Sequence, residues 1–372
     1  MSRRTILHTI ETSGPGGAET VLLQVASRLD RDRFRSLALL PDEGWLSQQL
    51  EEAGVHVYFA RSKGWHDFRV PRMMRRLIRQ ENIDLIHSHL PGHNFYSCLA
   101  GKLAGSRTVA TYHGAVEFER TTPLKNRIRQ ATVRRWADTV VVVCDYVGRL
   151  IESRGFPPHK IVRIYNGINA ARFAAACDGR LRGELRVPET APLVGTVANL
   201  RESKGYEFFV RAARLVIDRA PETHFVAVGD IDPDLGRPLF ALVDELGLGD
   251  RLHFLGFRRD VPEILSALNV FVLASLSEGF PLVALEAMAA GKSVVMTRSG
   301  GQQEIVEDGR SGLLIPPADA EALAAGIGQL LENPARAQEM ACRARARVRA
   351  DFTLEKMVGE YEKLYDRLIE EE

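Results

Sequence analysis

Two glutamates stand out in SEGFPLVALEAMAAGKSVV, residues 277–295, where the neighbours are mostly apolar. Pro281 has the fixed φ favoured at a first helical position, so we expect a helix from Pro281 to about 289–291. Its N-terminus favours negative charge. Glu286 would share a face with Leu282, and a carboxylate buried there needs hydrogen-bond donors. A ribose diol supplies two, as in dinucleotide-binding folds; an arginine or backbone amides are the alternative partners.

Two cations follow a predicted strand in GTVANLRESKGYEFF, residues 195–209. Arg201 and Lys204 stand on this loop just before a predicted helix. Cations beside a helix N-terminus suit a diphosphate, although they could also be two solvated surface charges. Both this loop and the one that carries Glu278 follow predicted strands, and we expect strand-end loops of this kind to line the ligand site.

A glycine-rich loop, ETSGPGGAET at 11–20, follows the first predicted strand. Gly16 and Gly17 leave the backbone uncrowded just before a helix expected from about Ala18. Such a loop can bring free N–H groups close to an anion or a sugar, and a simple tight turn is the alternative. Its spacing is neither GxGxxG nor a phosphate loop with a lysine.

Histidines and aspartates at other strand ends complete the set of candidate residues. His113 ends a predicted strand and should point toward the ligand, where histidine can hydrogen-bond or move protons. HSHLPGH, 87–93, lacks a carboxylate that would complete a metal site, so we expect it to line the acceptor side. Asp230-Ile231-Asp232 runs into Pro233, and we expect a turn rather than a metal site. We therefore expect no cofactor and no obligatory metal.

Short β-branched runs alternate with amphipathic segments along the whole chain, which is the signature of an α/β fold with parallel strands. Thirteen strands are predicted, within 4–10, 34–40, 55–60, 83–89, 107–113, 139–144, 160–165, 192–200, 224–230, 252–257, 270–275, 293–297 and 311–317. The pattern weakens at 170–190. We therefore predict two doubly wound Rossmann-like domains with a boundary near 175–188, whose strand-end loops line a shared cleft.

Composition limits the class of protein. With 372 residues and 26% charged residues, the chain is an ordinary two-domain globular protein, and it has no apolar run of roughly 18 residues. The four cysteines are scattered, which favours a cytoplasmic protein. Residues 1–185 carry 28 basic and 18 acidic residues (28 − 18 = +10) and the remainder 21 and 30 (21 − 30 = −9). Because no nucleic-acid motif accompanies this asymmetry, we expect no nucleic-acid partner.

The block from Glu278 to Glu286 resembles the E-x7-E signature of retaining glycosyltransferases of family 4, which have the GT-B fold. Other blocks are similar to the same family along nearly the whole chain: PGGAE (15–19), YNGIN (165–169), FLGFRRDVPEILSALNVFVLAS (254–275) and SGGQQEIVEDGRSGLLIPP (299–317). The resemblance implies a nucleotide-diphosphate sugar donor, UDP- or GDP-linked, and transfer with retention of configuration.

The resemblance also assigns roles to individual residues. It implies that Lys204 contacts the diphosphate, that Glu286 holds the ribose and that Glu278 holds the donor sugar. His113 would lie near that sugar, and the backbone at Phe280, Pro281 and Leu282, like Gly16 and Gly17, would face sugar and phosphates. Many members have an arginine where this chain has Asn199, and Arg201 is the candidate to supply that charge.

We accordingly expect an enzyme with an acceptor-binding domain at 1–180, joined by a final helix at 353–372 that crosses back to it, and a donor-binding domain at 188–352. The acceptor would be a saccharide or a lipid-linked sugar of envelope or extracellular polysaccharide synthesis. A sugar-nucleotide epimerase or hydrolase of the same fold, or a non-catalytic saccharide-binding protein, is the alternative.

A basic, partly apolar helix expected at 121–136 could also lie on an anionic membrane surface, with the protein peripheral to the inner face. Its charges and its apolar contacts are Lys125, Arg127, Arg129, Arg134 and Arg135, and Leu124, Ile128, Ala131 and Trp136. The alternatives are a solvated helix or one that guides an anionic acceptor.

Overall fold

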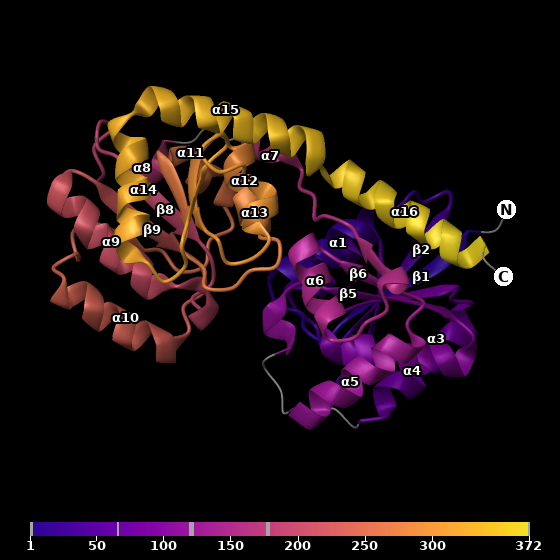
Figure 1. The fold of residues 1–372 in the computed structure, drawn as a ribbon. Coiled ribbons are helices and arrows are strands. Elements are labelled where there is room, and N and C mark those ends of the chain that lie inside the picture. The colour runs from indigo at the N-terminus through magenta and orange to yellow at the C-terminus, as the bar shows by residue number, and fades with distance from the viewer. Residues whose placement is uncertain (1–2, 65–66, 119–122, 176–178, 371–372) are drawn as a thin grey trace. The chain divides into compact units, whose positions relative to one another are not determined.

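The computed structural model describes residues 3–64, 67–118, 123–175 and 179–370, which form two compact units (Figure 1). The first unit comprises Met1–Asn166 and Leu354–Glu372, and the second comprises Gly167–Thr353. The chain enters and leaves the second unit side by side, because the Ile168 backbone N–H donates to the Phe352 carbonyl at 3.0 Å.

The first unit is built on a seven-stranded parallel sheet with the order β3-β2-β1-β4-β5-β6-β7. Its strands are β1 (Arg4–Ile10), β2 (Phe34–Leu40), β3 (His56–Phe59), β4 (Leu85–His89), β5 (Arg107–Tyr112), β6 (Thr139–Val142) and β7 (Ile161–Arg163). Chain order reverses between β1 and β4, which creates the switch point where doubly wound sheets bind ligands.

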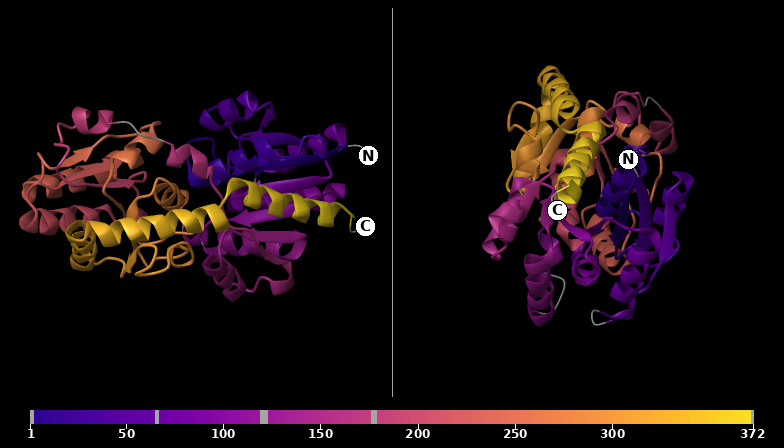
Figure 2. Two further views of the ribbon diagram at one scale, coloured as in Figure 1. Left: turned by 90° about the horizontal axis from the view of Figure 1, so that it is seen from above. Right: turned by 90° about the vertical axis from the view of Figure 1, so that its right-hand side faces the viewer.

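Helices cover both faces of this sheet, as Figures 1 and 2 show. They are α1 (Gly17–Arg28), α2 (Trp45–Glu52), α3 (Arg69–Glu81), α4 (Pro91–Ala104), α5 (Pro123–Trp136), α6 (Asp145–Ser153) and α16 (Leu354–Glu370), with the 3-10 turns η1 (Ala115–Phe118) and η2 (Pro158–Lys160). Two apolar clusters result, one under α3 and α4 and the other under α1 and α2. The near-continuous apolar runs of the strands are explained by this double cover.

The second unit has a six-stranded parallel sheet with the order β10-β9-β8-β11-β12-β13. Its strands are β8 (Leu193–Val197), β9 (His224–Val228), β10 (Leu252–Phe254), β11 (Val270–Leu273), β12 (Ser293–Thr297) and β13 (Leu313–Ile315). Its helices are α7 (Ala170–Ala174), α8 (Arg180–Glu184), α9 (Tyr206–Arg219), α10 (Pro233–Glu245), α11 (Val261–Ala267), α12 (Leu282–Ala289), α13 (Gln302–Ile305), α14 (Ala320–Glu332) and α15 (Pro334–Asp351), with the turn η3 (Glu202–Lys204).

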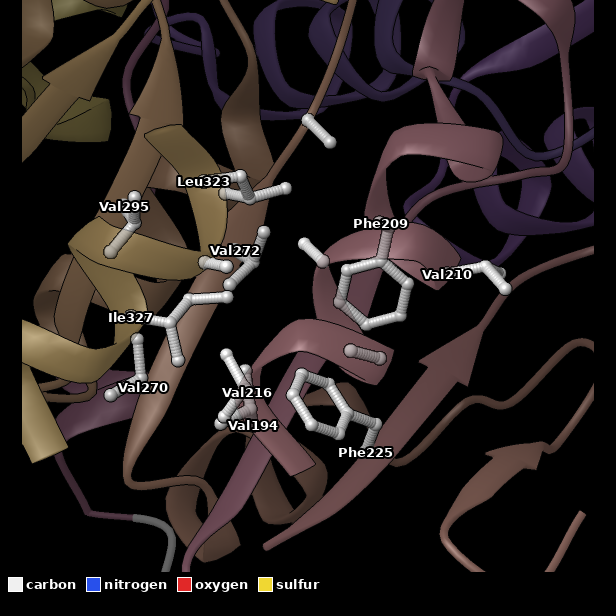
Figure 3. Close-up of a cluster of buried hydrophobic side chains, with 14 of the residues drawn as sticks. Val194, Phe209, Val210, Val216, Phe225, Val270, Val272, Val295, Leu323 and Ile327 are labelled. Atoms are coloured by element: carbon white, nitrogen blue, oxygen red, sulfur yellow. The ribbon is translucent and has the colours of Figure 1, made fainter. Parts of the chain in front are cut away.

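A large apolar core holds the second unit together (Figure 3). Phe209 of α9 and Phe225 of β9 meet edge to face with ring centroids 5.8 Å apart. Val272 of β11 and Ile327 of α14 belong to the same cluster and are fully buried. All thirteen predicted strands are present, and the α/β architecture of two doubly wound sheets is confirmed.

The division between the units falls earlier than the 175–188 segment where we predicted the domain boundary. The difference has a local cause in α8. Arg182 donates from Nη1 to the Ala191 carbonyl at 2.9 Å and from Nη2 to Asn269 Oδ1 at 2.9 Å, so α8 is part of the second unit. The hydrogen bonds of Arg182 thus hold this weakly patterned segment on the second unit, together with the buried Leu181 and Val187.

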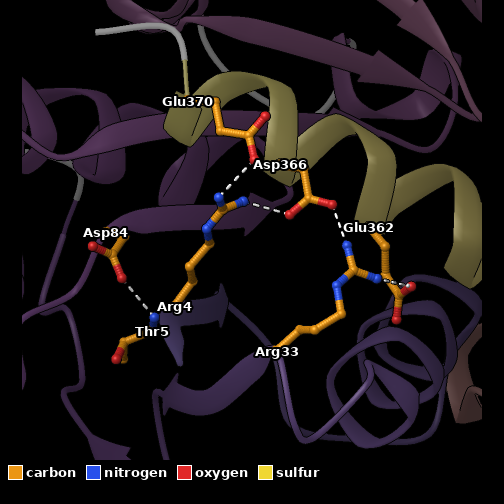
Figure 4. A network of polar contacts seen from close by, with 7 residues as sticks. All are labelled: Arg4, Thr5, Arg33, Asp84, Glu362, Asp366 and Glu370. Atoms are coloured by element: carbon orange, nitrogen blue, oxygen red, sulfur yellow. Dashed lines mark hydrogen bonds and ion pairs between the residues drawn. The ribbon is translucent and has the colours of Figure 1, made fainter. Parts of the chain in front are cut away.

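The final helix α16 packs on the first unit, as predicted (Figures 2 and 4). Tyr361 and Tyr365 are fully buried there. Arg4 pairs with Asp366 and with Glu370, and Arg33 pairs with Asp366 and, at 3.1 Å, with Glu362. These pairs join basic residues at the starts of β1 and β2 to acidic residues of α16, so they account for part of the charge asymmetry of the sequence.

Candidate active site

Glu278 and Lys204 come together at the carboxyl edge of the second sheet. Glu278 follows β11, and its Oε1 accepts from Lys204 Nζ at 2.6 Å and from Ser275 Oγ at 2.6 Å. The Glu278 backbone N–H donates to the Ser299 carbonyl at 3.0 Å, so the loop is held from the β12 side as well. With only 8% of Glu278 exposed, the carboxylate is fixed by charge-assisted hydrogen bonds.

Glycine at position 205 makes the approach of Lys204 possible. Gly205 ends η3 with φ +61°, and a Cβ there would collide with the Ala274 carbonyl oxygen. The Leu276 N–H donates to the Ser203 carbonyl at 2.7 Å, so the loops after β8 and β11 are joined. Lys204 and Glu278 therefore lie on two strand-end loops that hydrogen bonds hold together.

Helix α12 begins at Leu282, one residue later than predicted, because Pro281 takes the N-cap position with an extended ψ of 115°. Glu286 lies on its second turn and is only partly exposed. Burial raises the pKa of Glu286 to about 7, and the opposing effect of Arg172 is smaller. No hydrogen-bond donor reaches its carboxylate among the residues that the structure describes. The arginine and amide partners that we considered as alternatives are thus not hydrogen-bonded to it.

The other predicted residues of this edge take supporting positions. Phe280 is buried against Phe352, with ring centroids 5.4 Å apart, so its side chain anchors the loop. Asn199 Oδ1 accepts from the Asp230 N–H at 2.9 Å and ties β8 to β9. Arg201 lies 3.6 Å from the Asp230 carboxylate and donates to the Leu200 carbonyl at 2.8 Å.

The Asp230-Ile231-Asp232 segment does not form the turn that we expected, because Ile231 forms an isolated parallel bridge with Leu200 and Asp232 has an extended backbone. Asp232 caps α10 by accepting from the Asp234 N–H at 3.0 Å, with Pro233 as the first helical residue. Asp230 already faces Arg201, as described above. Across the described ranges, no group of three or more His, Cys, Asp and Glu side chains is arranged to hold a metal ion.

In the first unit, the glycine loop leads directly into α1. Gly16 is its N-cap, and a Cβ there would collide with the buried Glu19 carboxylate, which also accepts from Thr12 Oγ1. Gly17 begins the helix, and a Cβ at this position would meet open space. Gly16 is therefore needed for packing, whereas nothing structural requires glycine at 17.

His113 follows β5 and belongs to a chain of buried polar groups. Its Nε2 lies 2.8 Å from His89 Nδ1. Its backbone N–H donates to Glu117, which also accepts from the Gly114 N–H at 2.9 Å. Burial lowers the pKa of His113 to about 3 and raises that of Glu117 to about 8. At neutral pH His113 is thus an uncharged hydrogen-bonding group.

The histidines of the HSHLPGH segment separate into two environments. His87 is fully buried between Thr111 Oγ1 at 2.8 Å and the Tyr365 hydroxyl at 2.6 Å, so the expectation that it lines an acceptor surface is wrong. The reason is strand alternation and the cover by α16. His93, at the start of α4, does line a cavity in the first unit.

Family comparison gives the function class. Residues 15–172 match the family described as Glycosyltransferase Family 4, and residues 179–347 match Glycosyl transferases group 1. The chain belongs to glycosyltransferase family 4. A family 4 glycosyltransferase with the GT-B fold agrees with the two parallel sheets described above.

Three similar proteins illustrate the family. N-acetyl-alpha-D-glucosaminyl L-malate synthase of Bacillus anthracis is 28% identical over 81% of this chain and 79% of its own. UDP-Gal:alpha-D-GlcNAc-diphosphoundecaprenol alpha-1,3-galactosyltransferase of Escherichia coli is 27% identical over 94% and 93%. The structure of Anabaena Alr3699/HepE in complex with UDP is 25% identical, with a TM-score of 0.87 over 98% of this chain and 100% of that one.

The structure of this glycosyltransferase also contains residues that the motifs did not indicate. Ser275, the last residue of the 254–275 block, holds Glu278, and Glu117, four residues after His113, holds the His113 backbone. Arg129, which we assigned to a membrane-facing surface, is instead 8% exposed and lines the cavity next to His93. No described helix is both long enough and apolar enough to span a bilayer.

Proposed function

We propose that this chain is a retaining glycosyltransferase that moves a sugar from a UDP- or GDP-sugar to a saccharide or lipid-linked acceptor. The observation that carries the proposal is the Lys204–Glu278–Ser275 cluster beside α12. In the proposed roles, Lys204 and Arg201 balance the growing charge of the leaving diphosphate. Glu278 accepts from the donor sugar, and Glu286 accepts from the ribose hydroxyls.

The proposed reaction needs no covalent enzyme intermediate. An acceptor hydroxyl attacks the anomeric carbon on the face from which the diphosphate departs. The carbon–oxygen bond to phosphate breaks, and the hydroxyl proton passes to the departing phosphate oxygen. His113, neutral at pH 7, serves as a hydrogen-bonding partner of the sugar rather than as an acid, and Gly16 and Gly17 keep the backbone near the transferred group accessible.

Relatives support the substrate class and a role in the cell envelope. The Escherichia coli relative is named for transfer from UDP-Gal to a diphosphoundecaprenol-linked sugar, and the Anabaena structure holds UDP. We propose a related acceptor in envelope or extracellular polysaccharide synthesis, with the protein at the cytoplasmic face of the membrane.

A donor panel tests this function. Purified protein is incubated with UDP- and GDP-sugars and candidate acceptors, and the anomeric configuration of the product is read by NMR. An inverted product would refute retention, and a free sugar or an epimer as the sole product would favour the hydrolase or epimerase alternative. Transfer should persist in excess chelator; full loss that is restored by Mg²⁺ or Mn²⁺ would refute metal independence.

A further inference from the structure

The first unit contains a cavity of about 660 Å³ at the carboxyl edge of its sheet. The loops after β1, β2 and β3 line it, together with α4 and α5. Its charged lining residues are Arg61, Lys63, Lys125, Arg129, Glu11 and Asp42. Four cations against two carboxylates leave a net charge of +2 (4 − 2 = 2), which favours an anionic ligand.

Arg129 places a buried positive charge in the wall of this cavity. Only 8% of the side chain is exposed, and within the described residues its Nε has no hydrogen-bond partner. Its charge helps to lower the pKa of both Lys125 and His93, after burial itself. A guanidinium so buried needs acceptors for its N–H groups, and a phosphoryl group can supply several.

Glu11 opposes this positive charge only in part. The Gly92 N–H donates to its carboxylate, and a Cβ on Gly92 would collide with that carboxylate and lie 3.2 Å from Arg129 Nη2. Burial raises the pKa of Glu11, although Arg129 and Lys125 act in the opposite direction. Glu11 therefore lies against the start of α4, close to Arg129.

The rest of the wall is fixed in advance. The Tyr96 hydroxyl donates to the Gly64 carbonyl at 2.7 Å and meets Ser62 Oγ at 2.9 Å, which holds the loop that carries Lys63. Thr9 Oγ1 donates to the Leu39 carbonyl at 2.8 Å, so it accepts from His93 Nδ1–H. This network assigns His93 Nε2 as an acceptor, suited to a ligand hydroxyl.

We propose that this cavity binds the acceptor through a phosphoryl group held by Arg129, Lys125 and Lys63, with His93 receiving an acceptor hydroxyl. The proposal rests on the proposed transferase function, because it specifies the acceptor of that reaction. A soluble sugar phosphate and a lipid-linked diphosphate share this chemistry.

Calorimetry with inorganic pyrophosphate tests the cavity, with the donor site first saturated by UDP. Pyrophosphate should bind the wild-type chain, and Arg129→Gln and Lys125→Gln should each weaken it about tenfold or more, since a hydrogen bond to a charged group is lost. Glu11→Gln should strengthen it. Arg127→Gln, an exposed change on the same helix outside the cavity, should leave it unaltered.

The UDP affinities of the same proteins separate the two proposals. Wild-type protein that binds neither UDP nor GDP contradicts the proposed function, whereas binding of either nucleotide without pyrophosphate binding overturns the acceptor site alone. Equal weakening by Lys125→Gln and Arg127→Gln would also overturn it. Lys125 is partly exposed, so this variant decides the matter if Arg129→Gln does not fold.

Displacement of pyrophosphate identifies the source of the phosphoryl group. Glucose 6-phosphate in solution and undecaprenyl diphosphate in phosphatidylcholine vesicles are compared as competitors. Displacement by either supports the site and names its source; displacement by glucose or by plain vesicles, which carry no free phosphoryl group, contradicts it.

Discussion

The carboxyl edges of the two sheets carry different electrostatics on closely similar folds. In the second unit the key charges are paired: Lys204 with Glu278 at 2.6 Å and Arg201 with Asp230 at 3.6 Å. In the first unit burial keeps His87, His93 and His113 neutral, and Arg129 Nε lacks a hydrogen-bond partner among the described residues. The shared sheet topology fixes where a ligand can bind, and the loops decide which ligand it is.

This contrast bears on how each edge discriminates. A carboxylate held by Lys204 and Ser275 is preorganised to accept hydroxyl groups, while the lysine retains N–H groups for phosphate. A cavity lined by four cations and the neutral His93 instead favours an anion that brings its own hydrogen-bond acceptors. The second-unit edge would thus recognise the donor sugar through a fixed carboxylate, and the first-unit edge would recognise the acceptor through cations.

The largest expected effect comes from breaking the paired edge. Lys204→Met and Glu278→Gln should each lower kcat about 10²–10³-fold, because a preorganised electrostatic group is lost. Turnover with the donor found in the panel measures this effect. Arg211→Met is the control, since Arg211 forms an exposed pair with Glu207 on α9. Similar losses in all three variants, or full activity of Lys204→Met, would contradict the assignment.

The second prediction concerns acid stability. Burial lowers the pKa of His8, His93 and His113 to about 3, and it lowers the pKa of His87 and His89 well below 6.5. Each of these histidines is neutral in both states above the unfolded pKa near 6.5. Below that pH the unfolded state binds a proton that the folded state does not, so each histidine lowers the free energy of unfolding by about 1.4 kcal/mol per pH unit. Glu117, whose pKa is raised to about 8, and Glu11, whose pKa burial also raises, act in the opposite direction, and the facing Tyr361 and Tyr365 stay neutral.

The first unit should therefore open before the second as the pH falls from 6.5 to 5. Hydrogen exchange, corrected for its intrinsic pH dependence, follows β1, β4 and β5 against β8 and β11. His8→Leu should make the loss shallower, because neither ring nitrogen of His8 has a hydrogen-bond partner within the described ranges. Parallel loss of protection in both units would break the comparison.

The fold and the second-unit site were largely predictable from the sequence. Strand runs are local signals, and Glu278, Pro281 and Glu286 lie within nine residues of one another, so short-range rules place them. That the loops carrying Lys204 and Glu278 lie at one edge followed from parallel strands, but the direct pairing of the two side chains was not predicted. The α8 boundary was missed because it depends on Arg182 reaching Asn269, a contact with no periodic signature.

The first-unit site was predicted less well for the same reason. Arg129 and His93 are 36 residues apart (129 − 93 = 36) and meet only through the packing of α4 and α5. From helix composition alone, Arg129 resembles its exposed neighbours. His87 was misassigned because the sequence does not show whether a histidine near the end of a strand points into the core or toward the strand-end loops.

A third, smaller effect should come from Glu286, whose pKa is raised to about 7 by burial. Its neutral form stabilises the fold below the unfolded pKa near 4.5, and this contribution is lost as the pH rises through 7. Glu286→Gln should therefore be the more stable protein at pH 8 and nearly equal at pH 4.5. Thermal melting measures this.

The same substitution should weaken UDP binding, by about 1.5–3 kcal/mol if ribose hydroxyls donate to the carboxylate. The difference in UDP-binding free energy between wild type and Glu286→Gln should grow up to about pH 7 and then level off. Because UDP titrates equally with both proteins, this difference does not include the titration of UDP itself. Glu117→Gln should show no such linkage, since that carboxyl serves backbone amides. An unchanged UDP affinity in Glu286→Gln would refute the ribose assignment.

The smallest expected effect is at the surface of the first unit. On α5, Leu124 is 67% exposed, and Ile128 and Trp136 are also accessible. Arg127, Arg134 and Arg135 are exposed beside them. Helix α3 adds a row of exposed arginines, and both helices contact α4. With Arg129 reassigned to the cavity, this surface still joins apolar and basic side chains as membrane-surface helices do.

We therefore expect α5 to bring the first unit onto an anionic membrane, with about 1 kcal/mol from each exposed basic residue. Sedimentation with phosphatidylglycerol vesicles should show binding that weakens with salt and falls when Arg127, Arg134 and Arg135 become Glu. The same change at Arg219, Arg336 and Arg349, which are exposed on the second unit, should matter less. Charge reversal lowers net charge equally in both variants, so only a difference between them identifies α5 as the contact. Equal losses of vesicle binding in the two variants would show that only net charge matters. Equally strong binding to vesicles of phosphatidylcholine alone would exclude an electrostatic membrane contact.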